Sequence, residues 1–185
     1  MPRVSIIIPC FNKGEYLDGS LSSALSQTFR ETEAIVVNDG STDPFTLKKP
    51  SEISDPRVRV IHTPQSGLPA AMNNGIREAS GEYILPLDCG DRISPEYVEL
   101  AVRELDKDKA VGIVYSDAGR FGANTGIMEM PEYSRDTMLV RNLIHPSAFF
   151  RKADWERAGG YNSNMVYGWE DWDLWLSLIA LGAGV

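Results

Sequence analysis

Short apolar runs alternate with helical patterns from residue 3 to residue 115, and this alternation constrains the fold of the chain most. The apolar runs are short and rich in Val and Ile, so they predict buried strands. They cover residues 3–9, 33–37, 58–61, 83–87 and 111–115. Apolar residues at helical spacing fill residues 15–28, 67–79 and 95–106. Strands that alternate with helices predict an α/β fold, with a Rossmann-like, mostly parallel sheet flanked by helices.

The C-terminal part of the chain has a less regular pattern. Glycines and a proline punctuate residues 118–142, which predicts an irregular hairpin or loop. Residues 148–151 are expected to form a further strand, and residues 169–181 a helix. The apolar face of that helix is predicted to carry Trp172, Trp175, Leu176 and Ile179.

Ser94 and Pro95 predict where the helix over residues 95–106 begins. Serine is a favoured N-cap, and proline is favoured at the first helical position. We therefore expect Ser94 to cap this helix and Pro95 to be its first residue.

The composition excludes some classes of protein. The chain has 185 residues, enough for one domain with its own core, and a net charge of −8. Such an acidic chain lacks the basic face that nucleic-acid binding requires. No apolar run reaches the roughly 20 residues of a membrane span, and the N-terminus does not resemble a signal peptide. The two cysteines, Cys10 and Cys89, are expected to be reduced thiols in a cytoplasmic protein.

Two carboxylates, Asp88 and Asp91, follow the predicted strand 83–87 directly. Ligands of open α/β sheets bind in the crevice at the carboxyl ends of the strands. Carboxylate oxygens there suit Mg²⁺ or Mn²⁺ bound to a diphosphate. The alternative is a polar turn without a ligand, since Asp and Gly favour turns in any case.

A second polar cluster follows the strand over residues 33–37. The sequence Asn-Asp-Gly-Ser-Thr-Asp-Pro over residues 38–44 is explained in part by a tight turn and an N-cap. That explanation leaves the crowding of hydrogen-bonding side chains in one loop unexplained. Neither a Gly-x-Gly-x-x-Gly nor a P-loop motif is present. A nucleotide would therefore have to be held by side chains and a metal ion.

Five motifs in series resemble those of the family 2 glycosyltransferases, which have the GT-A fold. They span nearly the whole chain in the order and at the spacing usual for that family. The motifs are VSIIIPCFN at residues 4–12, EAIVVNDGSTD at 33–43, QSGLPAAMNNGI at 65–76, GEYILPLDCGD at 81–91 and GWEDWDLWL at 168–176. The resemblance implies an inverting, metal-assisted transfer of a sugar from a nucleotide-diphosphate sugar to a carbohydrate or lipid-linked acceptor.

The resemblance also implies roles for individual residues. The positions that match the family's nucleotide-sugar site are Pro9, Phe11, Glu33, Asp39, Asn73 and Asp88. Among them, Asp39 matches the acid that hydrogen-bonds the base, and Asp88 matches the first acid of the metal motif. Asp91 is then expected to be the second metal ligand. Asp171 matches the general base that an inverting transfer requires, with Glu170 beside it.

The sequence departs from the family pattern at two positions. Gly90 stands where the metal motif commonly has an acid, and Met72 stands where an arginine usually helps to hold the nucleotide. Both changes keep open the alternative of a non-catalytic nucleotide-sugar-binding domain. A nucleotidyltransferase is a further alternative, because it uses a similar sheet and metal chemistry.

The organisation that follows is one catalytic domain over residues 1–185. Residues 1–117 are expected to bind the nucleotide sugar, and residues 118–185 to form an acceptor side that is truncated at the C-terminus. The predicted location is cytoplasmic, with peripheral association at the inner face of a membrane left open. His62 and His145 are the only histidines, and for both an ordinary polar role is expected rather than a metal site.

Overall fold

A computed structural model describes all residues from Met1 to Val185. A six-stranded sheet lies at its centre, in the order β3-β2-β1-β4-β8-β5, and a two-stranded hairpin of β6 and β7 stands apart from it. The strands are β1 Val4–Cys10, β2 Thr32–Asp39, β3 Val58–Thr63, β4 Tyr83–Pro86, β5 Ile113–Val114, β6 Ala118–Arg120, β7 Gly126–Met128 and β8 Phe149–Arg151. Because β1 to β4 pair in parallel and only β8 runs against its neighbours, the predicted mostly parallel α/β sheet is confirmed.

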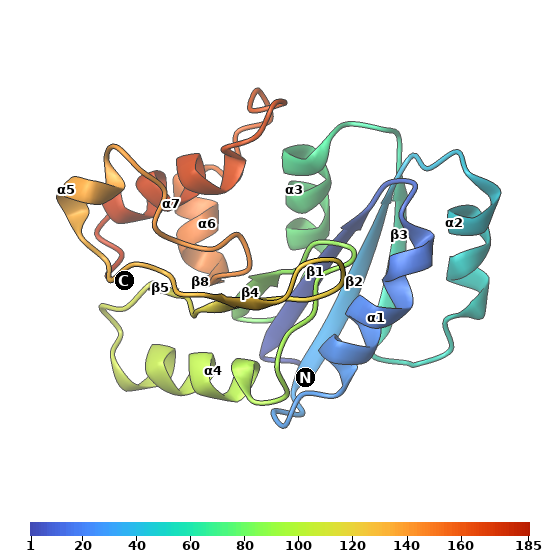
Figure 1. Cartoon of the computed structure of the whole chain (residues 1–185), viewed down its shortest axis with the longest axis horizontal. Coiled ribbons are helices and arrows are strands. Elements are labelled where there is room, and N and C mark those ends of the chain that lie inside the picture. The colour runs from blue at the N-terminus through green and yellow to red at the C-terminus, as the bar shows by residue number, and fades with distance from the viewer.

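The helices cover both faces of this sheet (Figure 1). They are α1 Gly14–Leu25, α2 Pro44–Lys48, a 3₁₀ turn Lys49–Glu52, α3 Leu68–Glu78, α4 Tyr97–Lys107, α5 Arg135–Met138, α6 Lys152–Ala158 and α7 Glu170–Ala180. Side chains of α1 and α4 pack on one face, and those of α3, α6 and α7 pack on the other. Successive residues of β1 supply both cores, since Ile6 and Ile8 face α1 and α4 while Ile7 faces α3.

The connection from β3 to β4 creates the switch point of the sheet. Strands β1, β2 and β3 progress toward one edge, and β4 then returns to the other side of β1. The chain leaves the neighbouring carboxyl ends of β1 and β4 toward α1 and α4, which pack on the same face of the sheet, and a crevice opens at these strand ends. In open α/β sheets this crevice is where ligands bind.

Helix α4 starts later than the sequence predicted. Its first residue is Tyr97, and Ser94 does not cap it. The carbonyl of Ser94 accepts from the Tyr97 amide at 3.1 Å and from the Gln27 side chain at 2.8 Å. The carbonyl of Pro95 accepts from the Thr28 amide at 2.8 Å. These bonds to the end of the α1 segment hold residues 94–96 in a turn ahead of the helix.

The buried face of α7 also differs from the prediction. The helix is present, but its buried residues are Asp171, Leu174, Trp175 and Leu178. Trp172, Leu176 and Ile179 are only partly buried and pack at the edge of the core. The helix is rotated about its axis so that the Asp171 carboxylate points inward. Helix propensity alone does not reveal this rotation. Helix α6 was not predicted, because it is only seven residues long. The hairpin within residues 118–142 and the strand near residue 150 were predicted correctly.

Gly75 explains how closely α3 approaches the sheet. A Cβ atom at this position would lie 2.5 Å from Ile7 Cγ2 and 2.9 Å from Val37 Cγ2. Both methyl groups belong to fully buried strand residues that have no room to move. The glycine thus lets the helix backbone rest directly on β1 and β2.

We expect Gly75→Ala to lower the free energy of unfolding by about 1–3 kcal/mol, the typical cost of overpacking a core. This loss outweighs the gain of about 1 kcal/mol that alanine brings to a helix. Urea denaturation followed by circular dichroism measures the change. Gly19→Ala in α1 is the matched control, because its Cβ would meet only the flexible end of Arg92, at 3.0 Å. Equal stability of Gly75→Ala and wild type would contradict the packing described here.

Candidate active site

Three strand ends meet around one cavity of about 260 Å³. Pro9 comes from β1, Asp39 from the end of β2, and Asp88 from the loop after β4. The full lining is Pro9, Cys10, Phe11, Lys13, Asp39, Gln65, Gly67, Leu68, Ala71, Asp88 and Cys89. Four predicted nucleotide-binding residues, Pro9, Phe11, Asp39 and Asp88, are therefore brought together by the fold.

Asp39 builds the wall of this cavity opposite β1. Its carboxylate accepts hydrogen bonds from the amides of Ser66 and Gly67, at 3.0 and 2.9 Å, and from the hydroxyls of Ser66 and Thr63. These bonds fix the loop that leads into α3. The side chain is buried, yet it still lines the cavity. Asp39 thus combines a structural role with a position at the cavity surface.

Asp88 and Asp91 lie in one tight turn, in which the Asp91 amide donates to the Asp88 carbonyl at 2.9 Å. Burial raises the pKa of the Asp88 carboxyl, and the negative charges of Asp91 and Asp171 raise it further. The positive charge of Lys13 acts in the opposite direction. The Asp88 carboxylate accepts no hydrogen bond from the protein, and the only charges that oppose its own are those of Lys13 and, when its ring is protonated, His145. A divalent cation would relieve this repulsion.

The carboxylates fit a metal ion that takes few ligands from the protein. No group of three or more His, Cys, Asp or Glu side chains is arranged to hold a metal. Mg²⁺ commonly binds through one or two carboxylates and completes its shell with water and substrate phosphates. Asp88 and Asp91 would be those two carboxylates.

Lys13 is a cavity residue that the sequence reasoning missed. It is the only cationic side chain in the lining, and it makes no ion pair. Its carbonyl accepts a hydrogen bond from the Cys89 thiol at 3.3 Å, which ties its loop to the Asp88 turn. Its place in the sequence could have predicted this role, because Lys13 lies in the first loop after β1, at the edge of the sheet where anionic groups were expected to bind.

Glu33 does not lie at this cavity. It stands near the start of β2, six residues from Asp39 and therefore roughly 20 Å away along the strand. Its carboxylate accepts from the Ser5 hydroxyl and the Ser80 amide, both at 2.7 Å, and pairs with Arg59 at 3.4 Å. These contacts join the start of β2 to the segment before β4.

Asn73 is likewise used inside the protein. Its amide nitrogen donates to the Tyr161 carbonyl, and its oxygen accepts from the Tyr161 amide, both at 2.8 Å. The side chain is buried and does not line the cavity. Asn73 therefore connects α3 to the turn after α6.

Asp171 lies in the first turn of α7 and lines a neighbouring cavity of about 330 Å³. Its side chain is buried, and it accepts a hydrogen bond from Asn142 Nδ2 at 2.9 Å. Trp169, just before the helix, lines the same cavity and is 62% exposed, so its ring is available to a ligand. Glu170 is half-buried, and burial raises the pKa of its carboxyl, as does the charge of Asp171.

The Trp169 backbone is strained. Its φ of 67° is in the left-handed region, which is unusual for a bulky residue, and Gly168 precedes it at φ 111°. Such strain is commonly retained at functional positions. Here it turns the chain so that α7 starts with Asp171 facing inward and Trp169 facing the cavity.

Comparisons with known proteins identify the family of the chain. Residues 5–166 match the sequence model of the family described as Glycosyl transferase family 2. The chain belongs to this family. The match covers both the strand ends around Asp39 and Asp88 and the segment with Asn142 that holds Asp171.

Individual relatives of this family 2 chain are larger proteins. Over 98% of the chain it is 32% identical to a chondroitin synthase of Pasteurella multocida, but it spans only 19% of that protein. Among solved structures, S. aureus TarS 1–349 superposes with a TM-score of 0.77 at 22% identity, covering 96% of the chain and 55% of TarS. A Pyrobaculum calidifontis mannosyltransferase, solved with GDP-Man and Mn²⁺, gives 0.76 at 22% identity, with 98% and 53% covered. These structures support the GT-A fold.

Gly90 and Met72, the two departures from the family pattern, have structural explanations. Gly90 has a φ of 115°, a conformation that L-residues rarely adopt, although a Cβ would meet nothing closer than Tyr16 Cβ at 3.5 Å. An acid there would strain the turn that presents Asp88 and Asp91. Met72 is buried in the core between α3 and the sheet, so it does not line the cavity between Asp39 and Asp88.

The raised pKa of Asp88 predicts a pH-dependent effect on stability in the family 2 chain. A raised pKa in the folded state means that folding favours the protonated carboxyl, so this group's contribution is most favourable in acid and is lost as pH rises through that pKa. Asp88→Asn removes the penalty. We expect the variant to unfold at a higher temperature than wild type at pH 7 in EDTA.

The difference in unfolding temperature should shrink as pH falls and vanish below about pH 3, where the carboxyl is protonated in both the folded and the unfolded state. Differential scanning calorimetry across this pH range measures it. Asp136→Asn, on an exposed part of α5, is the control. A variant less stable than wild type at pH 7 would contradict the assignment of an uncompensated charge to Asp88.

Proposed function

We propose that the chain transfers a sugar, with inversion, from a nucleotide-diphosphate sugar to a carbohydrate or lipid-linked acceptor, assisted by Mg²⁺ or Mn²⁺. One observation carries this proposal. Pro9, Asp39 and Asp88, from three different strand ends, line one cavity, and the charge of Asp171 is close enough to raise the pKa of Asp88. This supports a donor site and a base that lie side by side.

The donor is proposed to lie along the carboxyl ends of β1, β2 and β4. Pro9 and Phe11 would contact the base and ribose, and Asp39 would accept a hydrogen bond from the base. Lys13 would neutralise part of the diphosphate charge, as the only cation in the lining. Glu33 and Asn73 are not assigned to the donor, because their polar atoms are engaged elsewhere.

Asp88 and Asp91 are the proposed metal-binding residues. When bound, the cation would neutralise the negative charge that develops on the leaving diphosphate. The carboxylates would fix its position at the end of β4, beside the cavity. The deformed turn at Gly90 keeps both side chains in one loop.

Asp171 is the proposed general base. It would take the proton from the acceptor hydroxyl while that oxygen attacks the anomeric carbon, and the electron pair of the broken bond would leave with the diphosphate. The hydrogen bond from Asn142 orients the carboxylate.

The acceptor is proposed to bind on the side built by residues 118–185, next to the donor half over residues 1–117. The relationship to a chondroitin synthase supports a polysaccharide as product. No helix of the chain is long and apolar enough to cross a membrane. We propose a cytoplasmic location, with peripheral association at the inner face of a membrane where the acceptor is lipid-linked.

A non-catalytic nucleotide-sugar-binding domain is the second candidate. Gly90 favours it, because the metal motif has one acid fewer than the family pattern. The two functions differ in turnover, since a binding domain would hold the donor without releasing nucleoside diphosphate. Family membership argues against the nucleotidyltransferase alternative, which would release pyrophosphate.

Donor binding is tested by thermal shift with UDP, GDP and dTDP. We expect one of them to stabilise the chain in Mn²⁺ by about 2.7 kcal/mol at one hundred times its dissociation constant, and by much less in EDTA. Asp88→Asn should remove the difference between Mn²⁺ and EDTA, whereas Asp136→Asn should keep it. Equal shifts with Mn²⁺ and EDTA in wild type would count against a metal-assisted site.

The base is tested by Asp171→Asn. We expect the affinity for the donor to stay within a few-fold of wild type. The rate of acceptor-dependent release of nucleoside diphosphate should fall by about 10²–10⁴-fold. Asp173→Asn, in the same helical turn, is the control. Full activity of Asp171→Asn together with an inactive Glu170→Gln would transfer the role to Glu170.

A further inference from the structure

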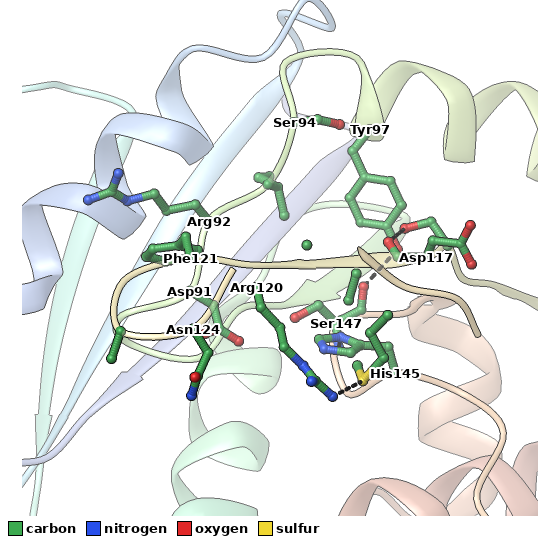
Figure 2. A pocket seen from close by; sticks show the side chains of 16 residues that line it. Asp91, Arg92, Ser94, Tyr97, Asp117, Arg120, Phe121, Asn124, His145 and Ser147 are labelled. Atoms are coloured by element: carbon green, nitrogen blue, oxygen red, sulfur yellow. Dashed lines mark hydrogen bonds between the residues drawn. The ribbon is translucent and has the colours of Figure 1, made fainter. Parts of the chain in front are cut away.

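A third cavity, of about 570 Å³, lies beside the donor site (Figure 2). It is enclosed by the turn after β4, the start of α4, the β6–β7 hairpin and the loop that contains His145. At one end it reaches Asp91. At the other, Met128 and His145 also line the cavity that contains Asp171. A ligand here would extend from the metal carboxylates toward the base.

Arg120 is the cation that this cavity presents. Figure 2 shows its side chain extending from β6 toward His145. Its only polar contact is with Met128 Sδ at 3.7 Å, and sulfur is a weak acceptor. It forms no ion pair, in contrast to Arg3, Arg57 and Arg157, which each contact a carboxylate. A guanidinium with nearly all its donors unused is thus available in a chain of net charge −8.

The other charged residues of the lining are already engaged. Arg92 lies over the Phe121 ring, 5.1 Å from its centroid, and its guanidinium extends toward Gly19 of α1, away from Arg120 (Figure 2). Asp117 accepts a hydrogen bond from the Met130 amide at 2.8 Å. Asp91 belongs to the proposed metal pair. In Figure 2 Asp91 and Asp117 lie on opposite sides of Arg120. Arg120 is the charge left for a ligand.

Neutral groups around Arg120 suit a sugar. Asn124 and Ser94 offer hydrogen-bonding side chains, and Phe121 offers an aromatic face, which stacks well on sugar rings. Nδ1 of His145 accepts from the Ser147 amide at 3.2 Å, so the neutral ring carries its proton on Nε2 and is a donor. The cavity volume is in the range of small-molecule sites.

We infer that this cavity binds the acceptor through a sugar that bears a carboxylate, and that Arg120 pairs with this group. The inference rests on the proposed function for the presence of a sugar acceptor. A guanidinium forms a bidentate ion pair, with two parallel N–H···O hydrogen bonds, to a carboxylate or a phosphate. Arg120 has no carboxylate partner of its own and can form one such pair, while Asp91 and Asp117 line the same cavity. A phosphate monoester would bring two negative charges toward these two acids and is repelled more strongly than a carboxylate, which brings one. The chemistry therefore favours a uronic acid.

The test uses the whole chain with UDP and Mg²⁺, and three disaccharide probes. The first ends in glucuronic acid, the second in glucose, and the third in glucose 6-phosphate. Binding is followed by the ¹³C-methyl NMR signal of Met128, one of six methionines, assigned with Met128→Leu. We expect the uronic acid probe to bind roughly tenfold more tightly than the neutral one, the preference typical of a charge-assisted pair.

Arg120→Gln should remove this preference and leave the weak affinity for the neutral probe. Arg120→Lys should keep part of this preference, because lysine retains the positive charge but cannot form the bidentate hydrogen bonds of a guanidinium. Arg30→Gln is the matched control, since Arg30 is exposed, makes no ion pair and precedes β2 at the opposite edge of the sheet. It should bind all probes as wild type does.

Four results would overturn the inference: equal affinity for the acidic and neutral probes, a preference that survives Arg120→Gln, tighter binding of the phosphate, or no binding of any probe. UDP thermal shifts on the same samples separate this failure from failure of the proposed function. If UDP binds and the probes do not, only the acceptor assignment is wrong. If none of UDP, GDP and dTDP binds, the donor proposal fails, while the Met128 signal still reports on the cavity.

Discussion

The pairing of β1 with two parallel neighbours is the constraint on which the rest of the structure depends. Backbone hydrogen bonds fix Cys10 opposite Asn38 on β2 and Ile7 opposite Pro86 on β4. The polar loops that follow these strands therefore begin at the same edge of the sheet, whatever their own conformational preferences. The donor cavity results from this alignment, and its acidic residues can remain partly uncompensated because the buried strands hold them in place.

The packing of α3 and α7 against the sheet positions residues around the candidate site. Gly75 allows α3 to lie against the sheet, and Asn73 of the same helix binds the Tyr161 backbone. This contact attaches the C-terminal part of the chain to the donor half. Trp175, fully buried, anchors α7 and leaves Asp171 at its first turn facing a cavity. The position of the proposed base thus depends on core packing more than on the loops that surround it.

The sheet and the donor edge could be predicted from the sequence, because strands as apolar as residues 4–8 and 83–87 have few other ways to be buried. Local patterns could not reveal contacts between distant segments. Glu33 matched a motif, yet Ser5 and Ser80 hold it at the far edge. Lys13 lacked a motif and became a cavity residue only because the Cys89 turn folds against its loop. The inward rotation of Asp171 likewise depends on how α7 packs.

The central claim is that metal and diphosphate meet at the strand ends near Asp88. Paramagnetic broadening of amide NMR signals by Mn²⁺, in the presence of the nucleoside diphosphate that binds, tests it most directly. We expect the amide signals of Gly67, Cys89 and Gly90 to disappear, while those of Thr32 and Gly81 at the opposite edge stay sharp. Broadening centred on the Glu33 edge, or spread evenly over the acidic surface, would contradict it.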